Sequence, residues 1–75
     1  MKTIADLKPG QKAYIESITE IDSWVERLMV LGLIEGAEVE YVGSAIGDNP
    51  IELKLHGGRM ALQREYAEKF IINEI

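Results

Sequence analysis

Two short runs of residues stand on either side of the glycine pair Gly57-Gly58. The first run, Ile51–Leu55, alternates strictly between apolar and polar residues, and the second, Arg59–Gln63, is a shorter segment of mixed character. Strict alternation places every second side chain on the same face of a strand, and two glycines supply the positive φ angles that a tight two-residue turn needs. The segment therefore predicts a β-hairpin whose register is set at Gly57-Gly58.

Three further segments have strand character. Gln11–Ile18 is partly β-branched and interleaved with polar residues, with Ala13 and Ile15 on one face. In Ala37–Tyr41, Val39 and Tyr41 share the buried face with Ala37 and alternate with glutamates, and Phe70–Ile75 is apolar. Turn-forming residues fill Gly47–Pro50, where the proline cannot donate to a ladder, so the next strand is expected to begin after it. Several short strands in so little chain favour a closed or nearly closed barrel over an open sheet. The predicted fold class is mostly β, a small barrel of about five strands.

One helix is expected inside this β pattern, over residues 23–31. Ser23 and Glu26 have the spacing of a capping box, and Gly32 supplies a left-handed stop. Apolar residues at i, i+4 and i+7 form a stripe that is predicted to face the sheet, namely Trp24, Leu28 and Leu31. Thr3 and Asp6 also have the spacing of a capping box, which predicts a single helical turn near the N-terminus. A second helical turn is predicted before the last strand, at Arg64–Lys69, with Ala67 pointing inward.

Length and charge limit the kinds of protein that this chain can be. Its 75 residues have room for one core, so a single domain over residues 1–75 is expected. The chain has no cysteine and must fold without disulfides, which fits a reducing compartment. The net charge is −5 and the eight Lys and Arg residues are scattered, which argues against nucleic acid as a partner. No run approaches the roughly 18 to 20 apolar residues of a membrane span, so no direct membrane insertion and a cytoplasmic location are expected.

Catalytic chemistry has little material to draw on. The only nucleophile and base that the chain offers are Ser17, Ser23 or Ser44 together with His56, and none of them lies in a recognisable motif. The glycines stand mostly at element junctions, and no phosphate-binding loop is present. We therefore predict a protein that is not an enzyme, that has no catalytic residues and that needs no cofactor.

Metal binding stays open at this stage. A tetrahedral site for a soft or borderline ion needs several Cys or His ligands, and the chain has a single imidazole. The weak candidates are His56 together with Glu52 or Asp48, which would form an oxygen-rich site for ferrous or another divalent ion.

The predicted helix carries more apolar residues than one core-facing stripe can hide. Val25 and Met29 lie beside the stripe and Val30 lies nearly opposite. Either the core face is wide enough to cover Val25 and Met29, or this helix exposes an apolar surface to a partner.

Together, several motifs resemble the FeoA family over essentially the whole chain. They are Leu7-Lys8-Pro9-Gly10, Arg27-Leu28-Met29-Val30-Leu31-Gly32-Leu33 with Gly36, Gly47-Asp48-Asn49-Pro50-Ile51, and Gly58-Arg59-Met60-Ala61-Leu62 before Ala67. The resemblance implies a small cytoplasmic SH3-like barrel of the bacterial ferrous iron uptake system, which binds the membrane transporter FeoB and modulates its GTP-dependent activity. Two positions depart from the family pattern: Gln63 stands where an arginine commonly follows Ala-Leu, and Asn49 lengthens the Gly-Asp-Pro turn.

Two functions are weighed on this basis. The leading hypothesis is an adaptor for the cytoplasmic GTPase side of a FeoB-like transporter, with a contact region at Val25, Met29, Leu33 and Ile34. The alternative is a metal-responsive regulatory module that binds a transition metal ion weakly. A homodimer formed through exposed strand edges is a third possibility.

Overall fold

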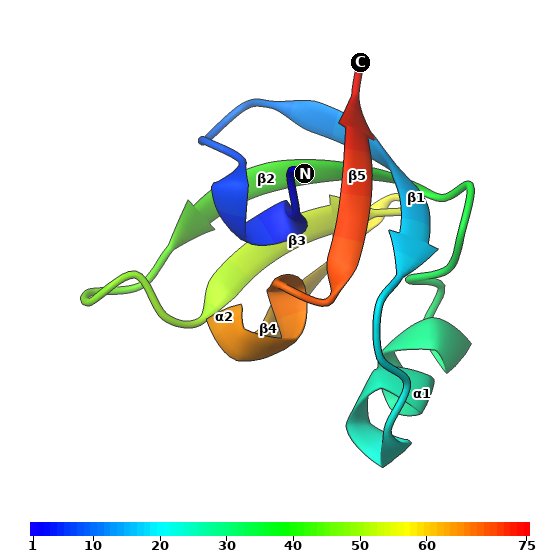
Figure 1. Cartoon of the computed structure of the whole chain (residues 1–75). Coiled ribbons are helices and arrows are strands. Elements are labelled where there is room, and N and C mark those ends of the chain that lie inside the picture. Colours follow the sequence, from blue (N-terminus) through cyan, green and yellow to red (C-terminus); the bar gives the residue numbers. More distant parts are fainter.

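Five antiparallel strands carry the fold in the computed structural model, which describes residues 1–75 (Figure 1). They are β1 (Lys12–Ile18), β2 (Glu38–Ser44), β3 (Ile51–Leu55), β4 (Gly58–Leu62) and β5 (Phe70–Glu74). The hydrogen-bonded order is β4-β3-β2-β1-β5, so β4 and β5 are the two edges of the sheet and do not pair with each other. The predicted mostly-β barrel of five strands is confirmed, with the qualification that its sheet curls without closing.

Irregular register in two pairs of neighbouring strands helps the sheet to curl. The pairing of β1 with β5 shifts between Ile15 and Ser17, and the pairing of β2 with β3 shifts between Tyr41 and Gly43. Such bulges bend a strand and increase its twist. The molecule is consequently almost equal in its three dimensions, 27 × 26 × 24 Å.

Alternation along the strands fills the interior of the curled sheet. The residues predicted to point inward from the first two strands, such as Ala13, Ile15, Val39 and Tyr41, are all buried. Each large apolar side chain that is fully buried contributes on the order of 1.5–3 kcal/mol relative to exposure. The largest fully buried side chains are Phe70, Ile4, Ile15, Leu33, Ile51, Leu53, Val25 and Val39.

The β3–β4 hairpin forms as predicted, but its turn lies one residue earlier than expected. The two loop residues are His56 and Gly57, whose φ angles are 51° and 79°, and Leu55 pairs with Gly58. Positive φ at both central positions matches the type I′ turn that suits the twist of a hairpin. This register keeps Leu53 opposite Met60 on the inner face, whereas a slip by one residue would turn the apolar side chains of one strand outward.

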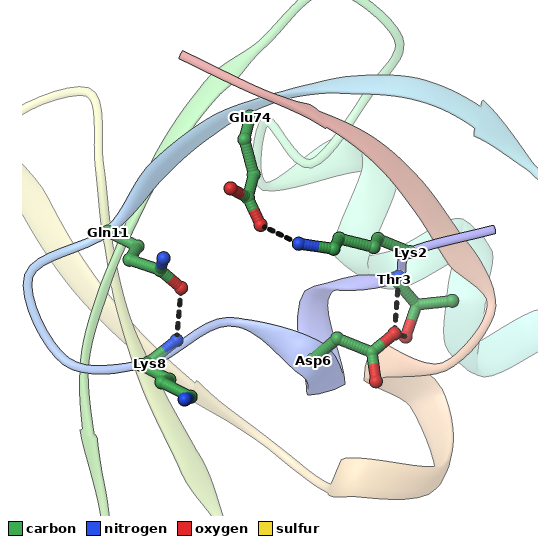
Figure 2. A network of polar contacts seen from close by, with 6 residues as sticks. All are labelled: Lys2, Thr3, Asp6, Lys8, Gln11 and Glu74. Atoms are coloured by element: carbon green, nitrogen blue, oxygen red, sulfur yellow. Dashed lines mark hydrogen bonds and ion pairs between the residues drawn. The ribbon is translucent and has the colours of Figure 1, made fainter.

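The N-terminal segment lies alongside the outer edge of β5. The 3₁₀ turn η1 (Ile4–Asp6) begins with the predicted Thr3–Asp6 box, in which the Thr3 N–H donates to Asp6 Oδ2 at 2.8 Å (Figure 2). Thr3 bridges to Ile71, and the Ile72 N–H donates to the Lys2 carbonyl. Lys2 Nζ also contacts Glu74 Oε1 at 2.8 Å, and this hydrogen bond raises the pKa of the Lys2 ammonium (Figure 2). One of the two sheet edges is therefore partly covered by the chain itself.

Two α-helices connect the strands. The first, α1 (Ser23–Val30), follows β1 and projects from one end of the barrel, and the single turn α2 (Arg64–Ala67) lies between β4 and β5 (Figure 1). Neither helix has the length and apolar character that spanning a membrane would require.

Candidate partner-binding surface

The start of α1 is fixed by Asp22 and not by Ser23, which the sequence analysis had assigned as the cap. Asp22 Oδ1 accepts a hydrogen bond from the Val25 N–H at 2.9 Å, and this bond lowers the pKa of the Asp22 carboxyl. A carboxylate in this position satisfies a free helical N–H and interacts favourably with the helix dipole, which explains why it displaces the neighbouring serine.

Lys69 ties this helix start to the far end of the chain. Its Nζ contacts Glu20 Oε1 at 2.6 Å and Asp22 Oδ2 at 3.6 Å. The hydrogen bond with Glu20 raises the pKa of the Lys69 ammonium, so this residue stays charged at neutral pH. The N-terminal end of α1 is thereby held beside α2, which immediately precedes Lys69.

The end of α1 decides which of its leucines is buried. The Gly32 N–H donates to the Met29 carbonyl and the Leu33 N–H donates to the Leu28 carbonyl, which together form a Schellman motif, with Gly32 at a φ of 114°. This motif reverses the chain immediately after the helix. Leu33 is consequently turned into the core and has no exposed surface.

The face of α1 that the sequence analysis assigned to the core is instead largely exposed. Trp24 is 56% and Leu31 is 65% exposed, whereas Val25 is completely buried. The prediction for this stripe was wrong for Trp24 and Leu31, because α1 stands at the end of the barrel, whereas Leu28 is partly buried and packs against the core as predicted. Apolar residues that remain exposed on α1 and in the segments flanking it are Ile21, Trp24, Val30, Leu31 and Ile34.

Between α1, β4 and α2 the exposed stripe lines an apolar groove of about 280 Å³. Its lining residues are Trp24, Arg27, Leu28, Leu31, Ala61, Leu62, Gln63 and Tyr66. The rings of Trp24 and Tyr66 are 6.4 Å apart, and the Arg27 guanidinium lies 5.2 Å from the centre of the Trp24 ring. A cation over an indole face is attractive, so Arg27 is held at the rim of the groove with its charge available.

Arg64 fixes the position of α2, and with it the place of Tyr66 in the groove. The guanidinium of Arg64 donates to the carbonyls of Asp48 and Ala5 at 3.0 and 2.9 Å, and to the Tyr41 hydroxyl at 3.3 Å. The Arg64 N–H donates to Asn49 Oδ1 at 2.9 Å. Arg64 and Asn49 therefore join α2 to the β2–β3 loop. The sequence alone did not indicate this role for either residue.

The predicted contact region changes accordingly. Val25 and Leu33 are completely buried and offer no surface to a partner, so the prediction is wrong for these two residues. Met29 is partly buried against the core, and Ile34 is exposed. The residues that the sequence analysis missed are Trp24, Leu31 and Tyr66. The Gly32-Leu33 pair is the signal that indicates the reversal, because a Schellman motif commonly turns the residue after its glycine back onto the helix.

The three candidate metal ligands lie in three successive segments of the chain: the loop before β3, β3 itself and the β3–β4 turn. His56 lies in the turn, Glu52 lies within β3 at 3.6 Å from Arg59, and Asp48 lies in the loop before β3, where it accepts from the Ser44 hydroxyl. No group of three or more His, Cys, Asp or Glu residues is arranged to hold a metal ion. The metal site stays a prediction that the side-chain arrangement does not favour.

A larger hollow of about 400 Å³ lies over the outer face of the sheet. Half of its eight lining residues are charged, namely Lys12, Glu38, Glu40 and Lys54, and His56 also lines it. Lys12 and Lys54 both pair with Glu40 in the ladder, so opposite charges alternate across it. This hollow is polar and internally balanced in charge, and the apolar groove beside α1 is the better candidate for a binding surface.

Comparison with known proteins assigns the family. The family model of the FeoA domain matches residues 2–73. The chain belongs to the FeoA family. No curated protein sequence matches it.

Solved structures of FeoA proteins share its fold. FeoA of Chlorobium tepidum is 28% identical with a TM-score of 0.91, over 99% of this chain and 70% of that one. FeoA of Stenotrophomonas maltophilia is 26% identical with a TM-score of 0.86, over 97% of this chain and 91% of that one. That protein is described as a zinc-complexed prokaryotic SH3 domain protein and a candidate activating factor of ferrous iron transport. Iron(II) transport protein A of Clostridium thermocellum is 24% identical with a TM-score of 0.92, over 99% of this chain and 46% of that one. The SH3-like fold that the resemblance to the FeoA family implied is confirmed.

Proposed function

We propose that this FeoA-family protein is an accessory protein of ferrous iron uptake that binds a FeoB-like transporter on its cytoplasmic GTPase side and modulates the activity of that transporter. The observation that carries the proposal is the apolar groove beside α1, together with the exposed side chains around it. Family membership supplies the process, and the groove supplies a surface for the partner.

The composition of this surface supports protein binding. Trp, Tyr and Arg are the residue types that most often dominate the energy of protein interfaces, and one of each meets in the groove as Trp24, Tyr66 and Arg27. Apolar groups that stay exposed gain free energy when a partner covers them, at about 25 cal/mol for each Å² of apolar area removed from water.

The direct test measures binding of the purified cytoplasmic region of the transporter from the same source by calorimetry. Leu31→Asp places a charge in the groove and is expected to weaken binding by at least about tenfold, since a buried unpaired charge is costly at an interface. The matched control is Ile46→Asp, because Ile46 is fully exposed in the β2–β3 loop, away from α1 (Figure 1).

Equal affinities for Leu31→Asp and wild type would remove the groove from the interface. Absence of binding by the wild-type protein would overturn the proposed function itself. A titration of this protein into the transporter, with GTP hydrolysis as the readout, then tests modulation: a rate that rises or falls supports it, and an unchanged rate with saturated binding contradicts it.

A metal-responsive regulatory module is the weaker candidate. It needs several ligands at one place, and the structure groups no three of them. Anaerobic titration of ferrous ion into wild type and His56→Ala checks this directly, since a saturable heat that disappears in His56→Ala would favour the metal-responsive function.

A further inference from the structure

The free edge of β4 is the second unusual feature of this region. Of the two sheet edges, that of β5 is partly covered by the N-terminal segment, through the Thr3 bridge to Ile71. No backbone segment pairs with the outer side of β4. An open edge is a template for an added strand, because its outward N–H and C=O groups have no partner.

The hairpin register identifies which groups point outward. In a hairpin with a two-residue loop, the residues that flank the loop exchange both hydrogen bonds, and bonded pairs then recur at every second position. Leu55 pairs with Gly58, so the next bonded pair contains Met60 and the following one contains Leu62. The N–H and C=O groups of Arg59 and Ala61 therefore face away from β3, toward the free edge.

This edge and the apolar groove are adjacent. The groove is lined from β4 by Ala61 and Leu62, and from α1 by Trp24, Leu28 and Leu31. Side chains of an added strand would alternate between the two sides of the sheet, so every second one would point toward the groove. Main-chain pairing and an apolar pocket are the two components of recognition by strand addition.

Charge indicates the composition of the occupant. The chain has 13 Asp and Glu residues against eight Lys and Arg, yet the groove is lined by the cation of Arg27 and by no carboxylate. A second cation, Arg59, lies on β4 itself, and its contact with Glu52 at 3.6 Å joins side chains that are 59% and 43% exposed, so this ion pair is weak. The free edge thus presents positive charge on an otherwise acidic protein.

We propose that the partner docks by strand addition: an extended apolar and acidic segment of the transporter's cytoplasmic part pairs with Arg59 and Ala61 of β4, places an apolar side chain in the groove and directs a carboxylate toward Arg27. This inference rests on the proposed function, since the occupant is a segment of that transporter. It goes further by naming the backbone groups that bind and the conformation of the segment.

Amide hydrogen exchange by NMR tests the pairing on the intact protein. In the free protein, the Arg59 and Ala61 amides exchange fast, whereas the Met60 and Leu62 amides are already protected by β3. In the complex with the cytoplasmic region of the transporter, Arg59 and Ala61 are expected to slow by at least about tenfold, and Met60 and Leu62 serve as internal references.

A proline variant provides the second measurement. Ala61→Pro removes an N–H that faces the edge and leaves the ladder with β3 intact, as prolines on edge strands do. It is expected to weaken binding by at least about tenfold, while Ala61→Ser, which keeps the N–H, binds like wild type. Arg27→Gln is expected to weaken binding more at low salt than at high salt, because the interaction is electrostatic.

The outcomes separate the two proposals. Binding without protection of Arg59 and Ala61 overturns strand addition and leaves the proposed function standing. Absence of binding overturns both. If the two amides are already protected in the free protein, and light scattering shows a dimer that Ala61→Pro dissociates, a second copy occupies the edge and the transporter segment is excluded.

Discussion

Leu31 and Leu33 form a matched pair for testing the structure, because they are the same residue type two positions apart and have opposite environments. Leu33 has no exposed surface and Leu31 is 65% exposed. Truncation of a buried leucine to alanine costs about 2–5 kcal/mol, because it removes apolar contacts and leaves a cavity. Leu31 buries about a third of its side chain, so Leu31→Ala is expected to cost about 0.5–1 kcal/mol, scaled from the value for full burial.

The assay is urea unfolding of both variants followed by far-UV circular dichroism. A domain of this length has a free energy of unfolding of about 4–11 kcal/mol, so Leu33→Ala removes a large fraction of it and Leu31→Ala does not. The slope of the unfolding free energy against urea should be the same in both, which shows that the same surface is exposed on unfolding. Equal losses, or a larger loss in Leu31→Ala, would refute the assignment of Leu33 to the core and of Leu31 to the groove.

Three further perturbations test local features of the fold. The pKa of Asp22 is lowered in the folded protein, so its contribution to stability is present above the unfolded-state pKa of about 3.9 and is lost as pH falls through the lower folded-state pKa. In unfolding titrations, Asp22→Asn should therefore lose less stability than wild type below about pH 4. A wild-type curve parallel to that of Asp22→Asn would contradict this. Arg64→Leu removes three donated hydrogen bonds and should lower the free energy of unfolding by about 1–3 kcal/mol, with Arg64→Lys recovering only part because an ammonium lacks the fork of a guanidinium. Full recovery by lysine would contradict the joining role. His56→Asn creates an Asn-Gly turn, the preferred pair for type I′, so thermal unfolding should show equal or higher stability, and a clear loss would argue against the turn assignment.

The sheet was predictable because its signals are local. Strict alternation fixes which face of β3 is buried, and the glycines near the hairpin limit where the chain can turn. The Thr3–Asp6 box and the inward Ala67 were also correct. The turn prediction was wrong by one residue, because Gly-Gly is a favoured pair for this turn and nothing local indicates that His56 adopts a positive φ. The strand pairing, with Leu55 opposite Gly58, shows where the chain turns.

The candidate site was less predictable, because a helical stripe shows that a helix has an apolar side but does not show what covers it. Trp24, Leu28 and Leu31 share a side of α1 as expected. That side faces the groove because the helix stands at the end of the barrel, where Val25 is its one completely buried residue and Leu28 and Met29 are only partly buried against the core.

By itself, the sequence determined where the strands and the helix form, because their signals are local. It also showed how few catalytic groups the chain carries. Tertiary structure alone decided which apolar side chains remain exposed and which backbone edge remains free, because both depend on contacts between segments far apart in the chain. The groove joins residues of α1 to residues of β4 and α2, and the open edge exists because β4 and β5 do not meet. Periodicity within one segment carries no information about either arrangement.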